Sequence, residues 1–100
     1  MANIKPFVQI LNECHREIIY GDTILRLCFQ WCRYFYEDLT SSGGYRFIWR
    51  KKRNDKWVLC TPRGQTRIKS IKLIKELIKQ AEKEGWGDYE ETAFGAQEIL

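Results

Sequence analysis

The stretch Tyr45–Cys60, "YRFIWRKKRNDKWVLC", decides the fold class of this chain, because its residues alternate with a period of two. Tyr45, Phe47 and Trp49 alternate with Arg46, Ile48 and Arg50, as the two faces of a half-buried β-strand would. The tetrapeptide "RNDK" carries turn-forming residues, and "WVLC" provides an apolar return segment. The stretch therefore predicts a β-hairpin.

The loop length of this hairpin determines which face each tryptophan occupies. A two-residue loop and a three-residue loop place Trp57 on opposite faces, because side chains alternate along a strand. We favour the three-residue loop, since it gathers Tyr45, Phe47, Trp49, Trp57 and Leu59 on one face as the floor of a core. If Trp49 or Trp57 instead faces outward, it would stack on exposed nucleic-acid bases.

The segment before the hairpin has apolar residues at helical spacing. We predict one helix over residues 3–20, with Asn3 as its N-cap, and a second over about 23–39. Gly21 would end the first helix, and Asp22 would cap the second. Residues 40–44, "TSSGG", would be a flexible linker and the candidate boundary between a helical half and the hairpin.

A second regular segment follows the hairpin. After a turn at "TPRGQ", residues 66–68 would form a short third strand. Ser70 then caps a helix over 71–84 that ends at Gly85. Its apolar stripe would comprise Ile71, Ile74, Leu77, Ile78 and Ala81. The fold expected is a single α+β domain over residues 1–100, ordered helix, helix, strand, strand, short strand, helix, with an acidic tail over 85–100.

Positive charge is concentrated in the middle of the chain. The formal net charge of the 100 residues is only +4. Residues 45–80, however, contain two acidic residues, Asp55 and Glu76, and twelve lysines and arginines. Such asymmetry indicates a polyanionic partner more strongly than the total charge does.

The candidate contacts to phosphate groups belong to this basic middle. Lysine and arginine neutralise phosphates and release counterions, and guanidinium groups add bidentate hydrogen bonds. The candidates are Arg46, Arg50, Lys51, Lys52, Arg53, Lys56, Arg63, Arg67, Lys69, Lys72, Lys75 and Lys79. If the hairpin tip and the lysine stripe of the last helix share a face, they would form one continuous positive surface. Lysine-rich turns and helix faces are, however, also common as purely solvated surfaces.

The sequence carries no catalytic or metal-binding signature. Cys28 and Cys32 lie four residues apart, without the C-x-x-C spacing of zinc sites, so the cysteines are expected to be free thiols in the core. His15 follows Cys14, but adjacent side chains on a helix diverge, which excludes a nucleophile–base pair there. We expect no enzyme activity, no metal and no cofactor. No apolar run approaches the roughly 20 residues that a transmembrane helix needs, and the N-terminus lacks a signal peptide, so we expect a cytoplasmic protein without membrane contact.

From residue 22 onward, the expected order of helix, strand, strand, short strand and helix resembles that of double-stranded-RNA-binding domains. The lysines of "IKSIKLIKELIK" lie loosely where that family keeps a basic cluster at the start of its last helix. Strands followed by a helix are also similar to small DNA-binding domains of phage integrases. These resemblances concern element order only, and no site residues are transferred from either family.

The functional expectation is a non-enzymatic accessory or regulatory protein that binds DNA or RNA mainly through phosphates. The alternative is a protein-interaction module, an inhibitor or adaptor whose basic hairpin docks on an acidic protein partner. In that alternative, the helical pair or the aromatic tail would form a homodimer.

Overall fold

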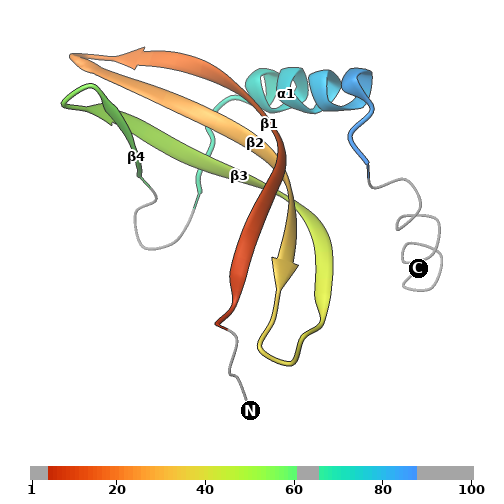
Figure 1. Cartoon of the computed structure of the whole chain (residues 1–100). Helices are drawn as coiled ribbons and strands as arrows, with labels where there is room; N and C mark the ends of the chain where they lie inside the picture. Colours follow the sequence, from red (N-terminus) through yellow and green to blue (C-terminus); the bar gives the residue numbers. More distant parts are fainter. Residues whose placement is uncertain (1–4, 61–65, 88–100) are drawn as a thin grey trace.

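The computed structural model describes residues 5–60 and 66–87, which form a four-stranded antiparallel sheet and one helix. The sheet order β1-β2-β3-β4 follows the chain (Figure 1). The elements are β1 (Phe7–Tyr20), β2 (Thr23–Phe35), β3 (Ser41–Arg53), β4 (Lys56–Leu59) and α1 (Ile71–Glu84).

The prediction of two N-terminal helices is wrong, because both segments are long strands. β1 and β2 pair antiparallel along their whole length, with Phe7 opposite Phe35 and Tyr20 opposite Thr23. The apolar residues of 23–35 satisfy a period of two as well as a helical period. The many β-branched and aromatic side chains of this segment fit a pleated strand better than a helix. The element order that resembled double-stranded-RNA-binding domains is therefore not present.

Gly21 and Asp22 form the tight turn of the β1–β2 hairpin rather than a helix end and a helix cap. The pairing of Tyr20 with Thr23 leaves only these two residues in the loop. Gly21 has a φ of 63°, a left-handed conformation that glycine adopts without steric cost.

The predicted linker over 40–44 is also wrong, since Ser41–Gly44 belongs to β3. The β2–β3 connection is closed by Asp38, whose Oδ1 accepts hydrogen bonds from the backbone N–H (3.0 Å) and the hydroxyl (2.6 Å) of Thr40. The ring of Tyr34 lies against Gly44, where an added Cβ would approach its Cε1 to 3.4 Å. The glycines thus allow a close cross-strand contact within one sheet.

The β3–β4 hairpin is confirmed, but its loop has two residues rather than three. Arg53 pairs with Lys56, which leaves Asn54 and Asp55 as the turn. Both turn residues have positive φ, 50° and 64°, as a type I′ turn requires. In this register Trp57 lies opposite Lys52, on the other face of the sheet from Trp49.

The predicted bounds of the last helix are confirmed. The Ser70 side chain accepts a hydrogen bond from the backbone N–H of Leu73, and Gly85 ends α1 in the left-handed conformation. The predicted third strand does not form, because residues 66–70 have no regular secondary structure. Arg63 and most of the predicted acidic tail lie outside the described residues. No helix in the described ranges is long and apolar enough to cross a membrane.

The core lies between the central strand β2 and α1. Leu27, Phe29 and Trp31 project from one face of β2 and pack with Leu77, Ala81 and Trp86, together with Cys14 from β1. Phe29 stacks on Trp86 with a ring-centroid separation of 5.6 Å. On α1 the buried residues are Leu77 and Ala81, whereas Ile71 and Ile78, predicted as part of the apolar stripe, are exposed.

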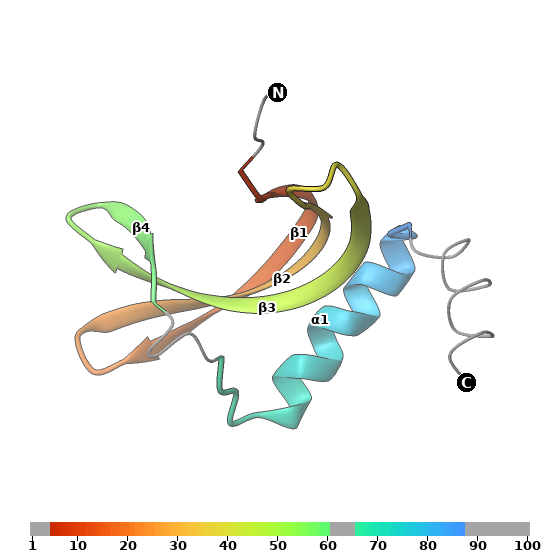
Figure 2. The ribbon, with the colours of Figure 1, turned by 90° about the horizontal axis from the view of Figure 1, so that it is seen from below.

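The strands bend sharply, and both views of the ribbon place α1 outside the bend (Figures 1 and 2). The sheet face opposite the helix therefore lines the inside of the bend. No described element covers this inner face (Figure 2). The inner face is therefore not covered by a second layer of the described fold, although Cys28, Gln30 and Cys32 at its centre are fully buried within the bend.

Candidate nucleic-acid interface

The inner face of the sheet carries a buried polar network centred on Gln30. Because side chains alternate, Gln30 on β2 lies beside Glu13 on β1 and Arg46 on β3, all opposite the helix-facing core. The side chain of Gln30 is fully buried, at 0% exposure, although no secondary-structure element covers this face. Neighbouring side chains inside the bend enclose it.

Each residue of this network forms a hydrogen bond with another member. Gln30 donates from Nε2 to Glu13 Oε2 (2.5 Å) and accepts at Oε1 from Arg46 Nε (2.6 Å). Arg50 donates from Nη1 to the same Glu13 oxygen (2.7 Å) and to Cys28 Sγ (3.2 Å). Two arginines are therefore held at fixed positions on the inner face, oriented by one amide and one carboxylate.

A second charged cluster lies toward the turns of the sheet. Arg26 donates from Nη2 to Glu17 Oε2 (2.6 Å), and its guanidinium lies 3.9 Å from the ring centroid of Trp57. The Arg26 Nε is buried and has no hydrogen-bond partner in the structure. A stacked guanidinium of this kind is a typical recognition surface for planar and phosphate groups.

The ionisation of the network follows from burial and pairing. Burial would raise the pKa of Glu13, but hydrogen bonds from Gln30 and Arg50, with the Arg50 charge, outweigh it, so the pKa of Glu13 is below its ordinary value. Burial would lower the pKa of Arg50, yet its contacts with Glu13 and Cys28 raise that pKa overall. Burial raises the pKa of Cys28 to about 11. Glu13 is therefore ionised, and Cys28 is a neutral thiol, at neutral pH.

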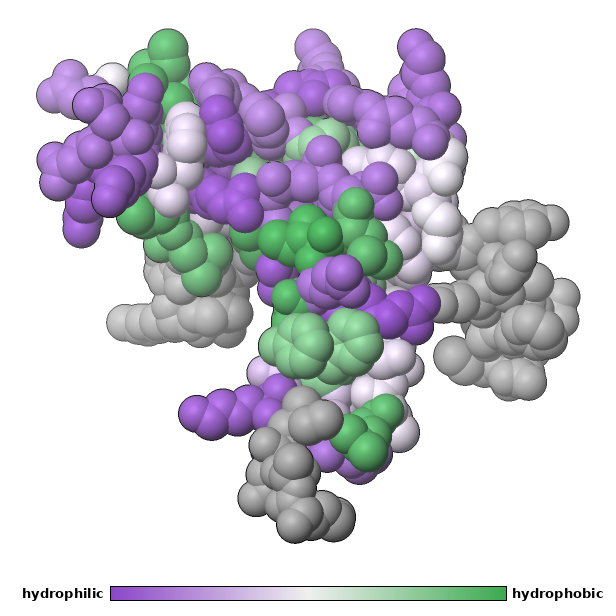
Figure 3. All heavy atoms as spheres, viewed as in Figure 1, coloured by the Kyte–Doolittle hydropathy of each residue, from purple (hydrophilic) through white to green (hydrophobic). Residues whose placement is uncertain are grey.

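The tip of the β3–β4 hairpin carries exposed positive charge on both faces of the sheet. Lys52, Arg53 and Lys56 are exposed at the end of β3 and the start of β4, and none of them forms an ion pair within 4.0 Å in the described parts of the chain. Hydrophilic side chains gather at this end of the molecule (Figure 3). Because side chains alternate, Lys52 lies on the inner face, whereas Lys51, Arg53 and Lys56 lie on the helix side.

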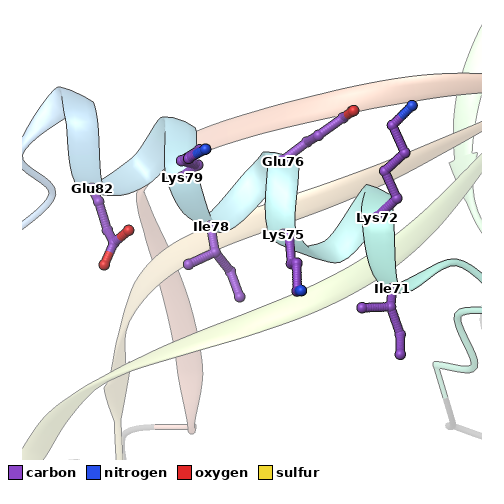
Figure 4. Close-up of a pocket in the computed structure, with 7 residues that line it drawn as sticks. All are labelled: Ile71, Lys72, Lys75, Glu76, Ile78, Lys79 and Glu82. Carbon is purple, nitrogen blue, oxygen red and sulfur yellow. The ribbon is translucent and has the colours of Figure 1, made fainter.

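The lysine stripe of α1 does not share a face with the hairpin tip. Lys72, Lys75 and Lys79 are exposed on the outer side of the helix, with Ile71 and Ile78 between them (Figure 4). The helix layer separates this stripe from the inner face of the sheet (Figure 2). Arg67 and Lys69 are exposed in the segment that leads into α1, on the helix side. The predicted basic residues thus form separate surfaces rather than a continuous one.

The two tryptophans have different environments. Trp49 packs against the core, and its Nε1 donates to the backbone carbonyl of Arg67 (2.9 Å). Trp57 is half-buried on the inner side beneath Arg26. Trp57 is therefore the stacking candidate of the inner face, and its ring is already paired with a cation.

Sequence reasoning missed four members of the inner face, namely Glu13, Glu17, Arg26 and Gln30. On the helix predicted over 23–39, Arg26 and Gln30 would point away from the apolar residues, toward solvent. The alternation of Arg26, Cys28 and Gln30 with Leu25, Leu27 and Phe29 is the signal that places them together.

Within residues 5–60 and 66–87, no three His, Cys, Asp or Glu side chains lie close enough together to hold a metal ion. Comparison with protein-family models, with curated proteins and with solved structures finds no match. The functional argument therefore rests on the geometry of the chain itself.

Proposed function

We propose that this chain binds nucleic acid without catalysis, through the inner face of the sheet and the tip of the β3–β4 hairpin. The observation that supports this most directly is the set of basic side chains that the bend and the hairpin register bring to one side. On the inner face they are Arg26, Arg46, Arg50 and Lys52, against the acidic side chains Glu13 and Glu17, and the exposed Arg53 and Lys56 add positive charge at the tip of the same hairpin.

The two parts of this surface have different tasks. The tip residues Lys52, Arg53 and Lys56 are exposed and would neutralise phosphates, which supplies affinity and salt dependence. Arg46 and Arg50 are oriented by Gln30 and Glu13, and a guanidinium with five donors retains N–H groups for a phosphate after these contacts. Such contacts position a backbone and imply little sequence preference.

The test is fluorescence anisotropy of labelled random-sequence DNA and RNA oligonucleotides across a salt series. The triple variant Lys52→Glu/Arg53→Glu/Lys56→Glu changes the tip. The variant Lys72→Glu/Lys75→Glu/Lys79→Glu makes the same charge change on the outer face of α1 and serves as the matched control.

We expect wild-type binding that weakens log-linearly with salt, with the tip variant losing at least tenfold in affinity and about three phosphate contacts from the slope. The helix variant should lose markedly less than the tip variant. Absence of binding at about 50 mM salt contradicts the proposal, and an equal loss in both variants contradicts the assignment of the surface.

A second function, protein interaction, is favoured by the edge of β1. The first residues of this edge strand include four exposed apolar side chains, Phe7, Val8, Ile10 and Leu11. An edge strand offers unpaired backbone groups to another chain, and exposed apolar residues strengthen such pairing. Ile10→Asn, which adds no charge to the inner face, should abolish a protein partnership at this edge, including a homodimer, while leaving nucleic-acid binding unchanged. Sedimentation velocity distinguishes a monomer from a dimer.

A further inference from the structure

A cavity of about 610 Å³ lies on the helix side of the sheet, away from the inner face. Its lining residues come from β1, β2, β3, the segment 67–70 and the first turn of α1. Its volume falls within the range of about 300–1,000 Å³ typical of small-molecule sites.

The walls of this cavity are apolar and come from every layer of the fold. The apolar lining side chains are Ile18, Leu25, Trp49, Ile68 and Leu73. All five are only half-buried, whereas the core residues beside them, such as Leu27 and Leu77, are fully buried. A ligand that covers this partly exposed apolar surface would be stabilised by about 25 cal/mol for each Å² removed from water.

The rim of the cavity is positive. Arg67 and Lys69 are exposed at its edge, and Ser70 places the N-terminus of α1 there. Among the described residues that line the cavity, none is acidic. A negatively charged group would therefore be favoured at the rim by two cations and by the positive end of the helix dipole.

The polar groups of the lining do not suit a nucleobase. The Trp49 Nε1–H is already bonded to the Arg67 carbonyl, and the Ser70 side chain accepts from the Leu73 N–H. The remaining lining offers the Tyr20 hydroxyl and the Cys60 thiol, which is too little to read the edge of a base. An alkyl or aryl chain needs no hydrogen-bond partner in the cavity.

From the apolar walls and the cationic rim, we propose that this cavity binds an amphipathic carboxylate, with its chain against Trp49 and its carboxylate between Arg67 and Lys69. This site is independent of the proposed nucleic-acid surface. The cavity lies on the helix side of the sheet, and the arginine network lies on the inner face.

The test is isothermal titration calorimetry with sodium dodecanoate, kept below its micellar concentration, against dodecylammonium and adenosine monophosphate at equal concentration. We expect saturable 1:1 binding of dodecanoate, with at least tenfold weaker binding of the other two ligands. Absence of saturable dodecanoate binding contradicts the proposal, as does equal or tighter binding of dodecylammonium or of the nucleotide.

Two variants locate the ligand. Ile18→Trp should fill the cavity and weaken dodecanoate binding at least tenfold, whereas Ile19→Trp, at a neighbouring side chain that is 77% exposed, should not change it. The double variant Arg67→Glu/Lys69→Glu should also weaken binding at least fivefold, and it leaves the hydrogen bond from Trp49 intact because that bond uses the Arg67 backbone. Far-UV circular dichroism checks folding, and the rim variant decides the question if Ile18→Trp does not fold. Unchanged affinity in the folded variants contradicts this site.

Discussion

At the scale of single residues, Gln30 is the most informative side chain of the molecule. Its amide joins Glu13 on β1 to Arg46 on β3, so one buried residue links three strands. A buried amide of this kind stabilises only if each of its partners is satisfied, as they are here. Gln30 therefore positions the arginines of the inner face and also contributes to the stability of the sheet.

Gln30→Ala should lower the free energy of unfolding by about 2–3 kcal/mol, because Glu13 and Arg46 lose a buried partner. Urea denaturation followed by tryptophan fluorescence measures this change. Gln9→Ala, at an exposed position of β1, is the matched control and should change stability by less than about 0.5 kcal/mol. Similar values for both variants would show that the network does not stabilise the fold.

The four cysteines should differ in reactivity with Ellman's reagent. Cys14, Cys28 and Cys32 are buried, and burial raises the pKa of each thiol. Cys60 is only partly buried. The native protein should show one fast-reacting thiol per chain at pH 8, which Cys60→Ser removes, because thiolate formation and access control the rate. A fast phase that persists in Cys60→Ser would contradict the burial of the other three.

At the scale of elements, the register of the β3–β4 hairpin decides the composition of the inner face. A two-residue turn at Asn54 and Asp55 places Lys52 and Trp57 on one side. A three-residue loop would have moved Trp57 to the helix side, beside Trp49. One residue of loop length thus determines whether Arg26 has an aromatic ring to stack on.

Asp55→Gly should stabilise the protein by about 0.5–1 kcal/mol. Asp55 has a φ of 64°, and an Asn–Gly pair is the preferred sequence of a type I′ turn. Asp55→Ala should instead destabilise by about 1 kcal/mol, since alanine lacks the freedom of glycine in this conformation. Thermal denaturation measures both variants, and the reverse order of stability would contradict the two-residue turn.

At the scale of the whole molecule, the bend of the sheet separates three surfaces. The inner face carries the arginine network, the outer side of α1 carries the lysine stripe, and the cavity opens beside the helix N-terminus. Charge that is contiguous in sequence is therefore divided between faces. The predictions on nucleic-acid binding depend on this division. The tip variant and the helix variant reverse the same number of charges and differ in where those charges lie on the fold.

The stability of the whole fold should be greatest between about pH 5 and pH 9. Because the folded pKa of Glu13 lies below its ordinary value of 4.5, its contribution is present above that value and is lost as the pH falls through the folded pKa. The pKa of Cys28 is raised from 9.0 to about 11, so its contribution is present below pH 9 and is lost as the pH rises toward 11.

Urea midpoints measured across the pH range test this profile. Glu13→Gln should flatten the acid limb, and it should also weaken the alkaline limb, because the charge of Glu13 helps to raise the pKa of Cys28. Cys28→Ser should flatten the alkaline limb. A wild-type acid limb that keeps its full slope in Glu13→Gln would show that other carboxyl groups cause the acid instability.

The sequence by itself determined the helix α1 and the β3–β4 hairpin, because the residues that cause each of them are close together in the chain. It predicted α1 with both ends, because Ser70 and Gly85 are strong caps that need no distant partner. It also predicted the β3–β4 hairpin, because the turn residues and the alternation lie within one short stretch. The basic character of residues 45–80 likewise needed no structure.

Only the tertiary structure decided between helix and strand for Phe7–Tyr20 and Thr23–Phe35. The apolar residues of these segments fit either period, and pairing of β2 with both β1 and β3 over most of its length settles the choice. The same pairing assembles Glu13, Gln30, Arg46 and Arg50 from three strands that are distant in sequence. Side-chain alternation and the bend of the sheet, which are properties of paired strands and not of any one segment, place those residues on one face and the lysine stripe on another.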